Sequence, residues 1–155
     1  MSISEIIQEK ISGTDWQSAT KKMNEKGYAF VPQFLPVRYC EELIGKYDNS
    51  ALYRKTITMD RYRFGLGEYK YFNYPLPDPI QTLRNAIYPK LAPVANEWMN
   101  MLDMKRRFPD MFDELQRLCQ ENNQTKPTVL ILKYDKGGYN TLYQDLYGEI
   151  FFPFN

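Results

Sequence analysis

The sequence predicts an α+β protein with a helical front and a stranded tail. Apolar residues recur at helical spacing within the first 50 residues. Aromatic and β-branched residues, which favour strands, are concentrated in residues 52–72. A continuous apolar and β-branched run at residues 128–132 is typical of a buried strand. We expect helices to pack on a sheet that these later segments begin.

Composition favours one soluble globular domain. The 155 residues are 43% apolar, which argues against a disordered chain. The net charge of +1 argues against strong attraction to nucleic acid or membrane, but it leaves a local basic patch as an alternative. Cys40 and Cys119 are too few for a disulfide framework or zinc site. The first residues do not resemble a signal peptide, and no apolar run is long enough to span a bilayer, so a cytoplasmic location without membrane contact is expected.

The first segment of this domain, about residues 1–50, is expected to be mainly helical. Ile3, Ile7 and Ile11 repeat at helical spacing, and a second helix is predicted between residues 14 and 27.

A short strand and a third helix follow in the prediction. Residues 28–31 read as a strand that Pro32 ends. Pro36 suits the first turn of a helix that carries Cys40 and Leu43.

The second segment, about residues 51–125, combines an aromatic hairpin with helices. Two strands are predicted around Gly65 and Gly67. A helix begins near Ile80, and Pro89 and Pro93 are expected to break or restart it. A further helix is predicted from Phe112 to about residue 122.

The third segment, residues 126–155, is predicted to hold the first core strands. The run at 128–132 is followed by a glycine turn at 136–138 and by a strand over 139–144. Another strand would begin at residues 150–152.

Three stretches, at residues 61–77, 83–98 and 126–154, resemble a bacterial family of 2-oxoglutarate/Fe(II)-dependent oxygenases described as acting oxidatively on damaged or methylated DNA. The resemblance implies a dioxygenase fold, a double-stranded β-helix or jelly roll of about eight strands, onto part of which the N-terminal helices would pack. It also implies Fe(II) and 2-oxoglutarate as cofactors, and nucleic acid as a substrate.

The family's iron-binding His-x-Asp turn corresponds to Tyr143, Gln144 and Asp145. Residues two apart on a strand share a face, so this spacing aims two side chains at one point. The resemblance makes Asp145 the metal carboxylate and places Tyr143 where the first histidine is expected. A phenol, with a pKa of roughly 10, must lose a proton before it binds metal well, and phenolate favours ferric iron. We therefore expect weak Fe(II) binding.

The rest of the family's site is expected to lie outside this sequence. Its second metal histidine and the basic residue that holds 2-oxoglutarate belong to strands after the turn, and the 155 residues contain no histidine. The expectation is therefore a truncated, N-terminal portion of an oxygenase, inactive alone. The alternative is a non-catalytic binding module on the same scaffold, which self-associates through an open sheet edge.

Two aromatic groups carry further hypotheses. Tyr134 and Tyr139, around the glycine turn, are candidates for lining a cofactor pocket, although cross-strand packing explains them equally well. The aromatics of residues 62–72 alternate with Arg61, Arg63 and Lys70, which suits base stacking with phosphate contacts. An ordinary hairpin with aromatics inside and charges outside gives the same pattern.

Overall fold

The computed structural model describes residues 1–142. The chain divides into two compact units, a helical unit of Met1–Lys46 and Pro77–Asn122, and a sheet unit of Tyr47–Leu76 with the chain from Asn123 onward. Both α-helices and antiparallel strands are present, so the predicted α+β class is confirmed. No helix among residues 1–142 is long and apolar enough to cross a membrane.

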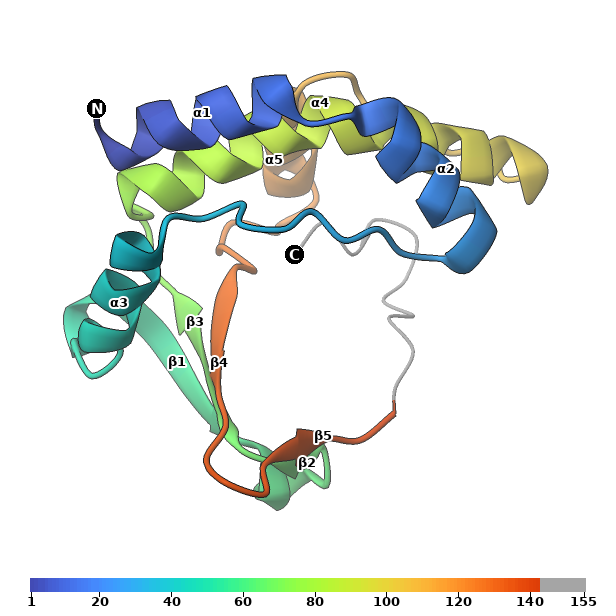
Figure 1. The fold of residues 1–155 in the computed structure, drawn as a ribbon. Coiled ribbons are helices and arrows are strands. Elements are labelled where there is room, and N and C mark those ends of the chain that lie inside the picture. Colours follow the sequence, from blue (N-terminus) through green and yellow to red (C-terminus); the bar gives the residue numbers. More distant parts are fainter. Residues whose placement is uncertain (143–155) are drawn as a thin grey trace. The chain divides into compact units, whose positions relative to one another are not determined.

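The helical unit contains five α-helices (Figure 1): α1 Ile3–Gly13, α2 Trp16–Lys26, α3 Val37–Gly45, α4 Asp78–Met101 and α5 Phe112–Glu121. Capping residues explain where the first two begin. The Ser2 side chain accepts from the Glu5 amide while the Glu5 carboxylate accepts from the Ser2 amide, and these bonds lower the pKa of Glu5. Asp15 caps α2, which ends at Gly27 in the left-handed conformation.

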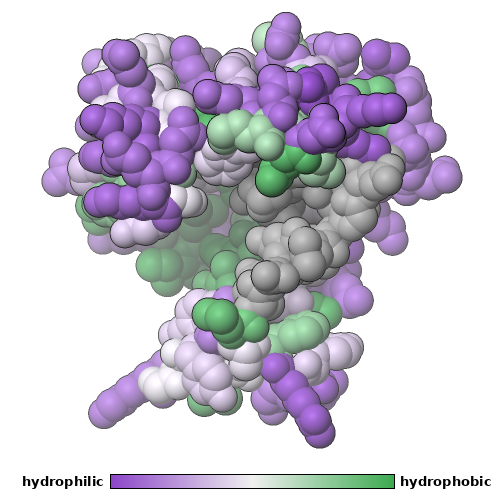
Figure 2. All heavy atoms as spheres, turned by 90° about the vertical axis from the view of Figure 1, so that its right-hand side faces the viewer, coloured by the Kyte–Doolittle hydropathy of each residue, from purple (hydrophilic) through white to green (hydrophobic). Residues whose placement is uncertain are grey.

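Helices α1 and α4 lie side by side and share the core of this unit (Figure 1). Ile7 and Ala92 are fully buried, and Ile11 and Ile80 are nearly so. Ile7, Ile11 and Ile80 stand in the apolar rows that the sequence predicts, so helical periodicity located these core positions correctly. Hydrophilic residues cover most of the surface of the helical unit that faces the viewer in Figure 2.

The prediction that Pro89 and Pro93 break the helix is wrong, because α4 continues through both. Asn85, Pro89, Pro93 and Glu97 form one row at intervals of four, and three of these residues are exposed while Pro89 is half-buried. A proline removes one helical donor and leaves the carbonyl four residues earlier free. On this outer row water can satisfy those carbonyls, while the opposite face stays packed.

The predicted strand at residues 28–31 is also wrong, since the structure has no strand there. Tyr28 and Phe30 are 66% and 77% exposed. A short apolar run alone cannot make a strand, because a strand needs a neighbour for its backbone hydrogen bonds, and these residues pair with none in the described chain.

The sheet unit holds five short strands, all in antiparallel pairs (Figure 1). One sheet has the order β1-β3-β4 and the other pairs β2 with β5. The elements are η1 Ser50–Leu52, β1 Tyr53–Thr58, η2 Met59–Tyr62, β2 Gly65–Leu66, β3 Glu68–Phe72, β4 Leu130–Lys133 and β5 Tyr139–Asn140. The predicted hairpin around the two glycines and the turn before β5 are therefore confirmed.

The core of the sheet unit is aromatic and apolar. Met59, Phe72, Ile57 and Tyr47 are each less than 8% exposed. The expectation of a strand covered on both faces at 128–132 is not met, since Leu132 is 43% exposed on β4.

The last predicted strands lie partly or wholly outside the described residues. In the described part β5 ends at Asn140, short of the predicted residue 144. The strand expected at 150–152 falls beyond residue 142.

Candidate functional site

The residues predicted to hold iron, Tyr143 and Asp145, lie outside the described residues. Across residues 1–142, no three His, Cys, Asp or Glu side chains gather closely enough to hold a metal ion. The structure describes the segment up to residue 142, which precedes these two predicted ligands in the sequence.

That segment is anchored by β2. Gly65 pairs with Asn140, and Leu66 pairs with Tyr139. Just beyond β5, the Thr141 amide donates to the Phe64 carbonyl at 2.8 Å. This hydrogen bond fixes the backbone at Thr141, two residues before Tyr143 in the sequence.

Gly65 is required for this pairing. Its φ is +133°, and a Cβ at this position would lie 2.0 Å from the Tyr139 carbonyl oxygen. Any larger residue would have to push β5 away, since ordinary contacts begin near 3.4 Å. The sequence pointed to a glycine turn here, and the close approach of two backbones is the reason for it.

Beside this junction lies an exposed cluster that we call the aromatic tip: Arg61, Tyr62, Arg63 and Phe64. The Tyr62 and Phe64 rings are stacked, with centroids 5.6 Å apart and planes 18° from parallel. They are 55% and 48% exposed. Hydrophobic residues are visible at this lower end of the sheet unit in Figure 2, where β2 and β5 lie.

The two arginines of the aromatic tip, Arg61 and Arg63, are exposed to solvent. Neither guanidinium makes an ion pair or hydrogen bond with any residue of the described chain. Arg63 ends η2 in the left-handed conformation, with φ 58° and ψ 29°. That conformation costs a non-glycine residue roughly 1–2 kcal/mol. The local fold tolerates this strain while displaying a long cationic side chain.

The aromatics of β3 behave differently from those of the tip. Phe72 is 2% exposed, and Tyr69 and Tyr71 are half-buried and contact each other edge to face. The predicted base-stacking segment therefore divides, because residues 68–72 form an ordinary packed strand while residues 61–64 project into solvent.

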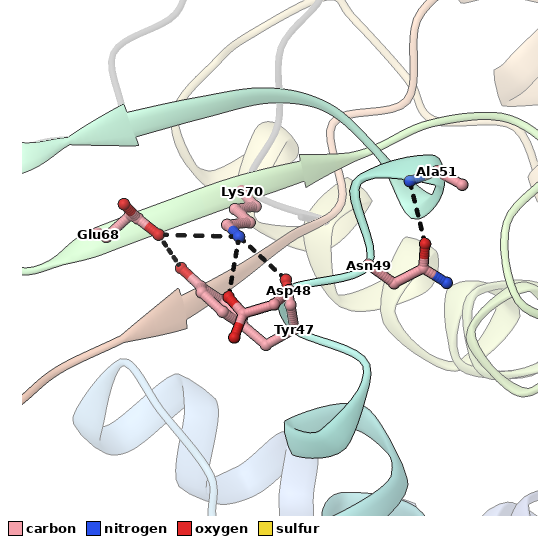
Figure 3. A network of polar contacts seen from close by, with 6 residues as sticks. All are labelled: Tyr47, Asp48, Asn49, Ala51, Glu68 and Lys70. Atoms are coloured by element: carbon pink, nitrogen blue, oxygen red, sulfur yellow. Dashed lines mark hydrogen bonds and ion pairs between the residues drawn. The ribbon is translucent and has the colours of Figure 1, made fainter.

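Lys70 is not a free cation either, because it lies inside a polar cluster with Tyr47, Asp48 and Glu68 (Figure 3). Its Nζ donates to the Tyr47 carbonyl at 3.0 Å and lies 3.6 Å from an Asp48 carboxylate oxygen. It also sits 4.2 Å from the centre of the Tyr47 ring. The ammonium is held by a carbonyl, carboxylates and a ring face, which is a structural role.

Tyr47 completes this cluster by donating its hydroxyl to Glu68 at 2.9 Å. Burial raises the pKa of Tyr47, and the Glu68 carboxylate raises it further because it accepts from the neutral phenol. The tyrosine thus stays protonated as a donor. No local sequence pattern indicates this arrangement, since Tyr47 and Lys70 are 23 residues apart.

A groove of about 350 Å³ lies next to the aromatic tip. Its charged lining residues are Asp60, Glu68, Lys133, Asp135 and Lys136. Neither tyrosine predicted to line a cofactor pocket is among its lining residues.

Those two tyrosines make cross-strand contacts instead. The Tyr134 ring lies over Gly67, and Tyr139 pairs with Leu66. They are 43% and 57% exposed. Their role in binding a cofactor stays a prediction.

The helical unit contains one group that sequence reasoning missed. The Arg84 guanidinium lies over the Phe112 ring at 4.5 Å, and its buried Nε and Nη1 atoms have no hydrogen-bond partner in the described structure. Burial raises the pKa of the neighbouring Cys119 thiol, and the Arg84 charge opposes this shift. An arginine next to the apolar row of α4 is the only sequence signal for this contact.

Comparison with known proteins finds one matching family and two related proteins. Residues 67–155, more than half of the chain, match a family described as "Oxygenase, catalysing oxidative methylation of damaged DNA". Two uncharacterized proteins of Mycobacterium tuberculosis, from strains CDC 1551 / Oshkosh and ATCC 25618 / H37Rv, are each 33% identical over 138 residues. These alignments cover 89% of this chain and 54% of each relative, so the chain spans about half the length of the curated relatives it matches.

No solved structure matches the chain. The family match includes β3, α4, α5, β4 and β5, and its range also contains Tyr143 and Asp145. The chain therefore belongs to the oxygenase family described as catalysing oxidative methylation of damaged DNA.

Proposed function

We propose that this chain is part of a 2-oxoglutarate- and Fe(II)-dependent oxygenase system that acts on nucleic acid. In this proposal the 155 residues supply the scaffold and a substrate-facing surface, without a complete metal centre. The family description, which names an oxygenase and damaged DNA, supports the reaction class and the substrate. The Gln144-Asp145 pair, which the resemblance aligns with the family's metal turn, supports the iron-dependent type.

The proposal that this chain lacks a complete metal centre rests on which metal-binding side chains the sequence contains. A non-haem Fe(II) oxygenase uses two histidines and one carboxylate on one face of the metal. The chain contains no histidine and has Tyr143 at the first histidine position. The residues present do not fit an Fe(II) centre of this type, so we assign no catalytic step to a metal bound by this chain alone.

The antiparallel strands are proposed to form part of a double-stranded β-helix. The hairpin of β1 and β3, extended by β4, would be one portion of it, and β2 with β5 another. Cys40 and Cys119 are free thiols, which suits a reducing compartment, and we propose a cytoplasmic location.

Anaerobic calorimetry with Fe(II) tests the donor argument. The unmodified chain should bind Fe(II) weakly, and Tyr143→His should bind it more tightly because imidazole is a neutral donor at pH 7. Adding Asp145→Asn to that variant should remove the gain. Tyr134→His replaces a different tyrosine, which is 43% exposed, by histidine and is the matched control.

Two outcomes would contradict the proposal. If Tyr143→His gains no more affinity than Tyr134→His, then Tyr143 does not occupy a ligand position. If the unmodified chain binds one Fe(II) tightly, the assumption of an incomplete centre fails.

A second candidate function is a non-catalytic module that self-associates through its sheet. In the described part, β1 and β4 are the edges of the three-stranded sheet, and Leu132 on β4 is 43% exposed. An edge strand of this kind can pair with a second chain. Light scattering should then show a dimer that Leu132→Lys disrupts. A monomer at all concentrations would rule this candidate out.

A further inference from the structure

We propose that the aromatic tip is a contact site for single-stranded or unpaired nucleic acid. Bases would stack on the Tyr62 and Phe64 rings while phosphates meet the Arg61 and Arg63 guanidinium groups. This inference rests on the proposed function only in taking nucleic acid as the substrate. It names the part of this chain that would touch it.

The stacked rings provide the first argument. Tyr62 and Phe64 form a nearly parallel pair that keeps about half of its surface in water. Proteins that bind single strands use such exposed rings as platforms, because every base has a π-face that can stack on them. On β3 the half-buried rings of Tyr69 and Tyr71 contact each other and the buried Phe72 ring contacts Tyr53, so they offer no such platform.

Charge complementarity provides the second argument. Arg61 and Arg63 alternate with the two aromatic residues in the sequence, and their guanidinium groups have no acidic partner in the described chain. Guanidinium binds phosphate oxygens through two parallel hydrogen bonds, and it also stacks on aromatic faces. An apolar protein partner would leave both charges unpaired, so the surface suits a polyanion with planar bases.

Backbone geometry provides the third argument. The tip is fixed at its base, where the Phe64 carbonyl accepts from the Thr141 amide and Gly65 allows β5 to approach. Arg63 holds a left-handed conformation in which glycine would be relaxed. A rigid platform loses little conformational entropy when it binds.

The chain offers an internal control. Tyr28 and Phe30 are also exposed aromatics two residues apart, at 66% and 77%. They lie in the helical unit, and no arginine adjoins them in the sequence. Replacing this pair by leucine removes the same kinds of side chain from an unrelated surface.

The experiment measures binding of the full chain to a fluorescent oligothymidylate of about ten nucleotides by anisotropy, at low and increasing salt. Tyr62→Leu combined with Phe64→Leu should weaken binding by about 5- to 150-fold. Tyr28→Leu combined with Phe30→Leu should leave it within about twofold. Arg63→Gly should weaken binding and lower the salt slope by about 0.7, while stability to urea is unchanged or increased.

The outcomes separate this inference from the proposed function. If the unmodified chain binds the oligonucleotide and the leucine tip variant binds it equally well, the tip assignment is overturned and a nucleic-acid substrate still stands. If the unmodified chain does not bind at low salt, both the tip assignment and the nucleic-acid part of the proposed function fail. If the tip variant alters only self-association by light scattering, the tip is a protein interface and the proposal is wrong.

Discussion

Replacing Gly65 by alanine should open the junction that organises the aromatic tip. The added methyl group would lie 2.0 Å from the Tyr139 carbonyl oxygen, whereas ordinary contacts begin near 3.4 Å. Relief of the clash therefore requires β5 to move by about 3.4 − 2.0 = 1.4 Å. A shift of that size along the Thr141 to Phe64 hydrogen bond would stretch it from 2.8 to about 4.2 Å, beyond hydrogen-bonding range.

The energetic cost follows from the same geometry. Losing this bond costs about 1 kcal/mol. Placing alanine at φ +133°, a backbone conformation that side chains rarely adopt, adds roughly 1–3 kcal/mol. The total is about 2–4 kcal/mol. Because β2 and β5 share only two residue pairs, the junction can open locally while the rest of the sheet unit stays folded.

Hydrogen exchange at the Thr141 amide is the appropriate assay. In Gly65→Ala this amide should exchange about 30- to 850-fold faster, which corresponds to the same total of about 2–4 kcal/mol. Gly137→Ala is the matched control, since Gly137 also has a positive φ of +85° but has no neighbour within 4 Å of its added Cβ. Equal exchange rates at Thr141 in the two variants would refute the close-approach argument.

Three further predictions concern the core and the helices. Tyr39→Phe removes a buried hydroxyl that has no partner in the described chain, so it should raise stability by about 1 kcal/mol in urea unfolding. Burial raises the pKa of Tyr39 from 10.0 to about 12, so the unfolded chain loses the phenol proton more readily than the folded chain. The stability of the unmodified chain is therefore unaffected by this group below pH 10 and falls as pH rises through 12. Tyr39→Phe should lose less stability over that window, and identical alkaline curves would contradict this. Lys70→Met should lower stability by about 1.5–3 kcal/mol, because the ammonium of this mostly buried side chain donates to the Tyr47 carbonyl. Lys21→Met, at an exposed ion pair, should change stability by less than about 0.5 kcal/mol. Equal effects of the two substitutions would contradict the structural role of the Lys70 cluster. Pro89→Ala restores a donor for the Asn85 carbonyl and should raise the melting temperature, while a clear decrease would show that α4 needs its proline.

Local chemistry was sufficient to predict most helices. The capping box at Ser2 and Glu5 and the glycine stop at Gly27 depend on neighbours within one turn, so they can be read from a short window. The α+β class and the hairpin around Gly65 were predictable for the same reason.

Features that depend on distant partners were not predictable. Residues 28–31 form a short apolar run before a proline, but they find no neighbouring strand in the described chain. Helix α4 tolerates two prolines because they lie on its outer row. The Lys70 cluster needs Tyr47 and Glu68 to meet through the sheet, which no local pattern reveals.

The candidate site was predicted in part. The alternation of arginines with aromatics was visible, but it did not show that Tyr62 and Phe64 project into solvent while Phe72 is buried. Burial, which distinguishes a stacking platform from a packed hairpin, is set by the sheet rather than by the sequence of the segment.

In the proposed function these 155 residues do not by themselves complete the oxygenase centre. Succinate formation from 2-oxoglutarate by the purified chain, with Fe(II), O₂ and a single-stranded oligonucleotide, measures this directly. We expect no succinate above a blank without protein. Succinate formation that depends on Fe(II) and is abolished by Asp145→Asn would contradict it.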